Sequence, residues 1–254
     1  MNKTLLVSEI FPPKHGGSGR WFWELYTRLP REHYYLAVGE HEQSASFDQT
    51  HDLNVSRINL SSPSWGIKSK VGLAFYWRVF AQLKQLIKTE KIKEVHCGRC
   101  LPEGVFGYLV NLFLGLPYLC YIHGEDVETA STSRELSWIV KKVCRRAKVL
   151  ICNSQNTKQI LIDSWAIDPG KIQVLHPGVD AGRFVPEQQN EQIGNALGWE
   201  NKKVVLTVGR LQKRKGHDKM IEAITQLKQQ IPNVLYAIIG KGDEEASLRK
   251  LVST

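Results

Sequence analysis

The stretch that decides the fold is Thr4-Leu-Leu-Val-Ser-Glu-Ile-Phe-Pro-Pro-Lys-His-Gly-Gly-Ser-Gly-Arg20. Its first five residues predict a buried strand, and the amphipathic segment from Gly19 to about Leu29 predicts a helix. A glycine-rich turn between them lets backbone N–H groups approach a phosphate at the positive end of the helix. The spacing of Gly16, Gly17 and Gly19 fits neither the dinucleotide fingerprint nor a Walker phosphate loop, so a plain tight turn remains an alternative.

The same alternation of strands and helices continues along the chain. Further strands are predicted at Tyr34–Val38, Val55–Leu60, Glu94–Cys97, Pro117–Ile122, Val149–Cys152 and Ile172–Leu175, and further helices at 67–90, 103–114, 132–147 and 154–164. This order predicts an α/β fold with a parallel sheet that has helices on both faces.

The pattern breaks after His176, where a polar stretch predicts a linker. A second α/β unit then begins, with strands at Lys203–Val208 and Val234–Gly240 and helices at 216–230 and 243–253. We therefore expect a first domain at 1–178, a linker at 179–199 and a partial second domain at 200–254. Two strands and two helices bury little core, so this second unit should expose sheet edges and apolar surface.

The charge of the chain is concentrated in two segments. The sequence has 254 residues and a net charge of +9, yet residues 66–93 and 202–215 each carry +6, so the remainder sums to −3. A basic segment suits nucleic acid, an anionic membrane or a phosphorylated ligand. We expect a diphosphate at the second segment and a membrane surface at the first, and we expect no nucleic-acid partner.

The predicted helix at 67–90 is both amphipathic and basic. Its apolar stripe is Val71, Phe75, Val79, Leu83 and Leu86. Such helices can lie on anionic membranes, but the same pattern also suits a helix that simply covers a sheet. No apolar run approaches the ~18–20 residues of a membrane span, and the N-terminus lacks a signal peptide. The expected location is cytoplasmic, with peripheral association at the inner face of the membrane.

Two further motifs follow predicted strands. Tyr121-Ile-His-Gly-Glu-Asp126 places His123 where ligands bind in open α/β sheets, although it could equally be a histidine bonded to its own turn. Val208-Gly-Arg-Leu-Gln-Lys-Arg-Lys-Gly-His217 places Arg210 and Lys215 before a helix, where their charges suit a diphosphate; a solvated basic loop is the alternative.

The pair Cys97-Gly-Arg-Cys100 allows a third reading, thiol redox chemistry. The chain is much longer than a thioredoxin-like domain. No second C-x-x-C offers zinc ligands, and the eight histidines show no metal-ligand spacing. We expect no metal site.

Taken together, these motifs resemble retaining glycosyltransferases of family 4 with the GT-B fold. The resemblance rests on Pro12–Gly19, His123-Gly124, Asn153-Ser154, His176-Pro-Gly-Val-Asp180 with Phe184, Gly209-Arg210 with Lys215-Gly216, and Ile239-Gly-Lys-Gly242. It implies two Rossmann-like domains across a cleft, with the acceptor on the first and the nucleotide-sugar on the second.

The resemblance also implies roles for single residues. Gly16 and Gly17 would lie beside the donor diphosphate, and Arg210 and Lys215 would bind it and stabilise the charge on the leaving group. His123 would contact the transferred sugar, with Glu125 and Asp126 as candidate sugar or acceptor ligands. The co-substrate would be a nucleotide-diphosphate sugar and the acceptor a glycan or lipid-linked molecule, with no metal or other cofactor.

The family's acidic E-x7-E motif and its base-binding segment have no counterpart in these residues. We therefore expect a fragment of a larger enzyme, in preference to one part of a split enzyme or an inactive remnant. The rival functional class is a non-enzymatic module that binds an anionic membrane through its basic segments.

Overall fold

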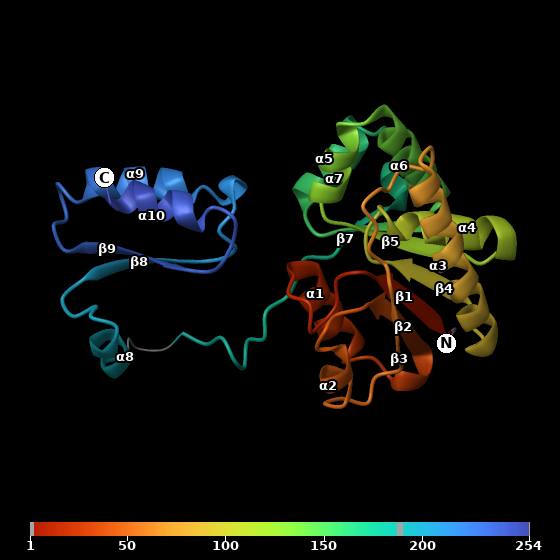
Figure 1. Cartoon of the computed structure of the whole chain (residues 1–254), viewed down its shortest axis with the longest axis horizontal. Helices are drawn as coiled ribbons and strands as arrows, with labels where there is room; N and C mark the ends of the chain where they lie inside the picture. The colour runs from red at the N-terminus through yellow and green to blue at the C-terminus, as the bar shows by residue number, and fades with distance from the viewer. Residues whose placement is uncertain (1–2, 187–189, 254) are drawn as a thin grey trace. The chain divides into compact units, whose positions relative to one another are not determined.

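The computed structural model describes residues 3–186 and 190–253 of the chain (Figure 1). It divides into two compact units, Met1–Val179 and Asp180–Thr254, and each is described by itself. The predicted linker at 179–199 includes residues 187–189, which lie outside the described residues.

The first unit is built on a seven-stranded parallel sheet whose strand order is β3-β2-β1-β4-β5-β6-β7. The strands are β1 (Thr4–Ser8), β2 (Tyr34–Gly39), β3 (Val55–Ile58), β4 (Glu94–Cys97), β5 (Tyr118–Ile122), β6 (Val149–Cys152) and β7 (Ile172–Val174). The α/β class and the parallel sheet are thus confirmed. The strand order reverses between β1 and β4, and ligands of open α/β sheets bind at such a switch point.

Helices connect the strands. They are α1 (Gly17–Tyr26), α2 (Ser44–Asp48), α3 (Lys70–Thr89), α4 (Glu103–Leu114), α5 (Glu125–Ser131), α6 (Arg134–Arg146) and α7 (Gln155–Asp163), with 3₁₀ turns η1 (Arg31–His33) and η2 (Pro169–Lys171). The predicted helix at 132–147 is therefore preceded by a separate short helix, α5. The predicted first helix begins two residues earlier than expected, at Gly17, and ends at Tyr26.

Alternate side chains along the strands pack into two apolar clusters, one on each face of the sheet. Leu5 and Val7 of β1 pack into the larger cluster with α3, α4 and α6. Leu6, which points the opposite way, packs with Trp21 and Phe22 of α1. Burial on both faces explains why β1, β2 and β5 read as nearly continuous apolar runs.

The structure confirms most of the apolar stripe that the sequence predicts for α3. Phe75, Val79 and Leu83 are buried and Leu86 packs partly against the core, but Val71 is 56% exposed. Val71 lies in the first turn of α3, so its place in the predicted core stripe was wrong.

The second unit holds two parallel strands, β8 (Lys203–Val208) and β9 (Val234–Ile239). Its helices are α8 (Glu191–Ala196), α9 (His217–Leu227) and α10 (Glu245–Ser253), with a 3₁₀ turn η3 (Lys213–Lys215). Figure 1 shows α9 and α10 on the same side of the two strands. Leu206, Val208 and Ile239 are exposed, as expected for a sheet of two strands.

Candidate functional site

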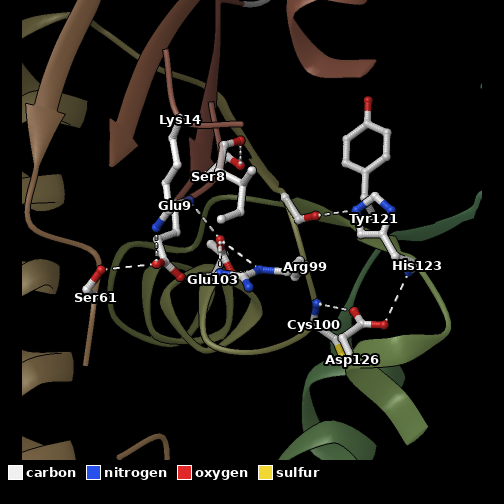
Figure 2. A network of polar contacts seen from close by, with 12 residues as sticks. Ser8, Glu9, Lys14, Ser61, Arg99, Cys100, Glu103, Tyr121, His123 and Asp126 are labelled. Carbon is white, nitrogen blue, oxygen red and sulfur yellow. Dashed lines mark hydrogen bonds and ion pairs between the residues drawn. The ribbon is translucent and has the colours of Figure 1, made fainter. Parts of the chain in front are cut away.

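The carboxyl ends of β1, β4 and β5 gather the polar groups that form the candidate site (Figure 2). Glu9 follows β1, Arg99 follows β4, and His123 follows β5. Adjacent parallel strands end at the same edge of the sheet, so these three residues meet although they are far apart in sequence. The site therefore lies at the switch point of the sheet.

A buried ion-pair network occupies the centre of this edge. The Arg99 guanidinium lies 2.6 Å from Glu9 Oε2 and 3.0 Å from Glu103 Oε1. Glu103 is fully buried in the first turn of α4, and its Oε1 also accepts a hydrogen bond from the backbone N–H of Glu9 at 2.8 Å. The network joins the ends of β1 and β4 to the start of α4.

The charges in this network fix its protonation. Burial by itself raises the pKa of Glu9, but hydrogen bonds from Lys14 and Arg99 outweigh it and lower the pKa below its ordinary value. Burial lowers the pKa of Arg99, and the charge of Glu103 more than reverses that, leaving it raised. The pair is therefore ionised throughout the neutral range.

Glu9 also tethers the glycine-rich turn. Its Oε1 accepts hydrogen bonds from Lys14 Nζ at 2.8 Å and from Ser61 Oγ at 3.0 Å. Phe11 is fully buried at the start of the turn, and the backbone N–H of Lys14 donates to its carbonyl at 3.1 Å. The turn is thus held at both its start and its middle.

Gly16 and Gly17 lie where this turn becomes a helix. Gly16 is the N-cap of α1, and Gly17 is the first helical residue. A Cβ at Gly17 would meet nothing within 4 Å, so there is open space beside this residue. A side chain at Gly19 would lie 3.0 Å from the Ile10 carbonyl, which explains why glycine is needed there.

His123 packs against the middle of α1. Its Nε2 lies 2.9 Å from the Gly98 carbonyl oxygen, and its ring contacts Trp21 and Phe22 of α1 edge-on, at centroid distances of 5.7 and 6.0 Å. Asn153 Nδ2 donates to the His123 carbonyl at 3.3 Å. The ring is therefore held by α1 and by the turn after β4, and the end of β6 holds the backbone of the same residue.

Glu125 and Asp126 open α5 and differ in surroundings. Glu125 is exposed, whereas Asp126 is buried. The Asp126 carboxylate accepts backbone N–H bonds from Cys100 at 3.1 Å and from His123 at 3.2 Å (Figure 2). Asp126 thus holds the His123 turn in place, and its expected contact with a sugar remains a prediction.

The two cysteines of the C-x-x-C pair have no features of a redox site. Cys97 and Cys100 are buried free thiols, and burial raises the pKa of both. A thiol with a raised pKa is a poor nucleophile. The two side chains belong to the core on the α3–α4 face of the sheet.

The second unit carries Arg210 and Lys215 on the connection from β8 to α9. Both are exposed, and Lys215 is the last residue of η3. The buried His217 places its Nε2 3.0 Å from the Arg210 carbonyl. The backbone of Leu211 is also bound, since its N–H donates to the Lys241 carbonyl at 3.0 Å. The connection that presents Arg210 is therefore fixed from two sides.

Five of the predicted site residues belong to the first unit, namely Gly16, Gly17, His123, Glu125 and Asp126, and among them Asp126 accepts a hydrogen bond from the His123 N–H. Arg210 and Lys215 belong to the second unit. Across residues 3–186 and 190–253, no three His, Cys, Asp or Glu side chains gather in a way that could hold a metal ion.

Sequence reasoning missed several residues of the site, chiefly Glu9, Arg99, Glu103 and His217. Glu9, Arg99 and Glu103 each lie just beyond a predicted strand or at the start of a predicted helix. That position at strand ends was the signal available, but nothing in their spacing shows that they pair with one another.

Comparison with known proteins identifies the family. The family model for Glycosyltransferase Family 4 matches residues 15–183, and that for Glycosyl transferases group 1 matches residues 189–254.

Two curated relatives illustrate the range of similar proteins. The chain is 24% identical over 251 residues to the GDP-mannose-dependent alpha-(1-6)-phosphatidylinositol monomannoside mannosyltransferase of Mycolicibacterium smegmatis, covering 98% of this chain and 63% of that protein. It is 28% identical over 169 residues to the UDP-Gal:alpha-D-GlcNAc-diphosphoundecaprenol alpha-1,3-galactosyltransferase of Escherichia coli, covering 63% of this chain and 43% of that protein.

Solved structures support the fold. The crystal structure of Anabaena HepE in complex with UDP matches with a TM-score of 0.76 at 17% identity, covering 99% of this chain and 65% of that one. This chain spans less than two thirds of the length of each of these relatives. Because the first family model alone matches more than half of its residues, the chain belongs to glycosyltransferase family 4.

Proposed function

We propose that this chain is part of an enzyme that moves a sugar from a nucleotide-diphosphate sugar to a glycan or lipid-linked acceptor, with retention of configuration. The names of two relatives support a nucleotide-sugar donor, one being GDP-mannose-dependent and the other using UDP-Gal. Because those two donors differ in both base and sugar, a panel of donors is needed to find the one used here.

The observation that carries this proposal is the contact of His123 with α1, the helix that begins at Gly17. The ring is held at the switch point next to Trp21, one helical turn from Gly17. A helix N-terminus favours negative charge, and a histidine can hydrogen-bond a sugar hydroxyl. The proposed roles are therefore diphosphate binding at Gly16 and Gly17 and sugar binding at His123.

Arg210 and Lys215 are proposed to bind and neutralise the leaving diphosphate. An arginine offers a planar fork of donors and a lysine offers a mobile charge, and the two complement each other on a diphosphate. Electrostatic stabilisation of a leaving group acts in the transition state and therefore raises kcat. The exposed Glu125 is proposed to contact the acceptor or sugar from the first turn of α5.

The direct test measures nucleoside diphosphate release from GDP- and UDP-sugars, with a lipid-linked acceptor present. Arg210→Met and Lys215→Met should each lower release about 100-fold. Lys202→Met is the matched control, because it removes an exposed positive charge from the same unit, before β8. Diphosphate release that both variants leave intact would contradict the proposal.

No metal is assigned a role in this proposal. Activity is therefore expected to persist in EDTA, with Mg²⁺ restored in a parallel sample as the control. Loss of activity in EDTA that returns with Mg²⁺ would show that a metal acts in the reaction.

A second candidate function, binding of an anionic membrane, has separate support. On α3 the exposed Trp77 contacts Phe113 of α4 at a ring-centroid distance of 5.6 Å, and both rings are about half exposed. Lys84 and Lys88 are exposed further along α3. Aromatic rings beside lysines suit the interface of an anionic bilayer. Among the described residues no helix is both long and apolar enough to span a membrane.

Flotation with phosphatidylglycerol vesicles tests this second function. The double variant Lys84→Glu/Lys88→Glu should reduce the floated fraction, and phosphatidylcholine vesicles should float little of either protein. Lys202→Glu/Lys228→Glu makes the same charge change at exposed positions of the second unit and serves as the control. Membrane binding without diphosphate release would favour the non-enzymatic function.

A further inference from the structure

The turn Gly98–Cys100, which follows β4, contacts four residues of the candidate site: Glu9, Glu103, His123 and Asp126. The Gly98 carbonyl bonds His123, the Arg99 side chain bonds Glu9 and Glu103, and the Cys100 N–H bonds Asp126. Each of its three residues thus faces a different partner. Figure 2 shows these contacts side by side.

The contact between His123 and Gly98 determines which ring nitrogen carries the proton. A carbonyl oxygen can only accept a hydrogen bond, so Nε2 of His123, 2.9 Å away, must be the donor. In the neutral imidazole Nδ1 is then an acceptor. A sugar hydroxyl that meets Nδ1 would therefore donate a hydrogen bond to this ring nitrogen.

The position of the Gly98 carbonyl is set by its neighbours. The Gly98 N–H donates to the Val7 carbonyl at 2.8 Å, which ties the turn to β1. A side chain at Gly98 would come within 2.7 Å of Ser8 Oγ and 3.1 Å of Phe22. The turn can approach β1 and α1 this closely only because residue 98 is glycine.

The side chain of Arg99 also holds the Gly98–Cys100 turn in position. Its guanidinium makes 3.2 and 3.1 Å contacts from Nε to the two carboxylate oxygens of the fully buried Glu103. Its Nη2, which also bonds Glu103, reaches Glu9, and Glu9 accepts a hydrogen bond from Lys14 of the glycine-rich turn. One side chain thus connects the turn that orients His123 to the turn that leads into α1.

We propose that Arg99 is a positioning residue for the transfer reaction, which acts through the Gly98–Cys100 turn to hold His123 as the Nε2–H tautomer with Nδ1 presented as an acceptor. Arg99 does not touch the substrate in this proposal. The proposal rests on the proposed function for the role of Nδ1, whereas the tautomer and its dependence on Arg99 can be measured without any turnover.

The test is long-range ¹H–¹⁵N NMR of the full chain labelled in its histidines, because the ¹⁵N shifts of the two ring nitrogens report the tautomer. His123→Gln assigns the signals. The wild-type chain should show the Nε2–H form for His123, and Arg99→Met should convert it to a mixture. A wild-type Nδ1–H form, or an Arg99→Met spectrum identical to wild type, would overturn the proposal.

Activity gives the second readout. Arg99→Met should lower kcat about tenfold or more with a smaller change in KM for the donor, because misplacement of a contact group mainly raises the barrier. Arg99→Lys keeps the charge and should recover part of both the kcat and the tautomer, which also provides a measurable variant if Arg99→Met does not fold.

The matched control is Arg31→Met. Like Arg99, Arg31 pairs with a carboxylate, that of Asp52 at 3.1 Å, and it also bonds the Tyr34 hydroxyl at 2.7 Å. It lies before β2, at the opposite end of the strands from the candidate site. It should change neither the His123 signals nor kcat. One outcome separates the two proposals: neither the wild type nor any variant releases diphosphate, while the NMR spectra still show the expected tautomer of His123 and its dependence on Arg99. In that case the proposed function fails, and the positioning of His123 by Arg99 stands.

Discussion

Glu9 and Arg99 form an ion pair of 2.6 Å across the point where the strand order of the sheet reverses. The two residues are 90 positions apart in the sequence, one after β1 and the other after β4. Open α/β sheets bind ligands at this point, and here it is spanned by a pair that also holds the glycine-rich turn. The pair therefore links the architecture of the sheet to the geometry of the candidate site.

The buried end of this network should be important for stability. Glu103→Leu leaves Arg99 with one carboxylate partner and the Glu9 N–H with none, so the free energy of unfolding should fall by about 3–5 kcal/mol. Urea unfolding followed by circular dichroism measures this change. Glu94→Leu is the control, because Glu94 pairs with the exposed Lys148 and should cost less than about 1 kcal/mol. Equal losses in the two variants would contradict the prediction.

His96 should make stability depend on pH. Burial, with a smaller effect of Lys148, lowers the pKa of His96 from 6.5 to about 4. Between these values the unfolded chain binds a proton that the folded chain does not, so stability is complete above pH 6.5 and falls as the pH drops towards 4. The full difference corresponds to about 3 kcal/mol, at ~1.4 kcal/mol per pH unit.

Unfolding free energies measured between pH 7 and pH 4.5 test this dependence on His96. His96→Gln, which does not titrate, should lose less stability over this range than the wild type does. His33→Gln, at a partly exposed position, should retain the wild-type slope. An unchanged slope in His96→Gln would show that other groups cause the dependence.

His217 should control the position of Arg210. Its Nε2 bonds the Arg210 carbonyl, which repeats in the second unit the way that His123 bonds Gly98. His217→Phe keeps an aromatic ring but cannot donate this bond, so diphosphate release should fall about tenfold. His217→Gln can still donate and should retain more activity. His33→Phe controls for the loss of a histidine elsewhere, and equal activity in His217→Phe and wild type would contradict this role.

The thiols should be unreactive in the folded protein. All five cysteines are buried and free, and burial raises the pKa of each. Dithiodipyridine should therefore react slowly with the native chain and rapidly with all five thiols in urea. Rapid reaction of two thiols in the native chain, lost in Cys97→Ser/Cys100→Ser, would revive the redox function.

Local pattern was enough to predict much of the sheet. The range of β1 agrees with the residues predicted from its apolar run, because a strand buried on both faces leaves an uninterrupted apolar signal. The ranges of β4, β6 and β8 also agree with the predicted residues. The glycine-rich turn, the strand-end position of His123 and the break into a second unit were also predictable. Helix α5 was missed, since its seven residues are too short for a periodic pattern.

Contacts between distant segments could not be predicted from the sequence. The sequence by itself determined which residues form strands, where the glycine-rich turn lies and which motifs mark the family, because these depend on neighbours along the chain. Only the tertiary structure decided that Arg99 meets Glu9 and Glu103, that the Gly98 carbonyl orients His123, and that Asp126 bonds backbone instead of solvent. The physical reason is the strand order: it brings the ends of β1, β4 and β5 to one edge, and no local pattern encodes that order.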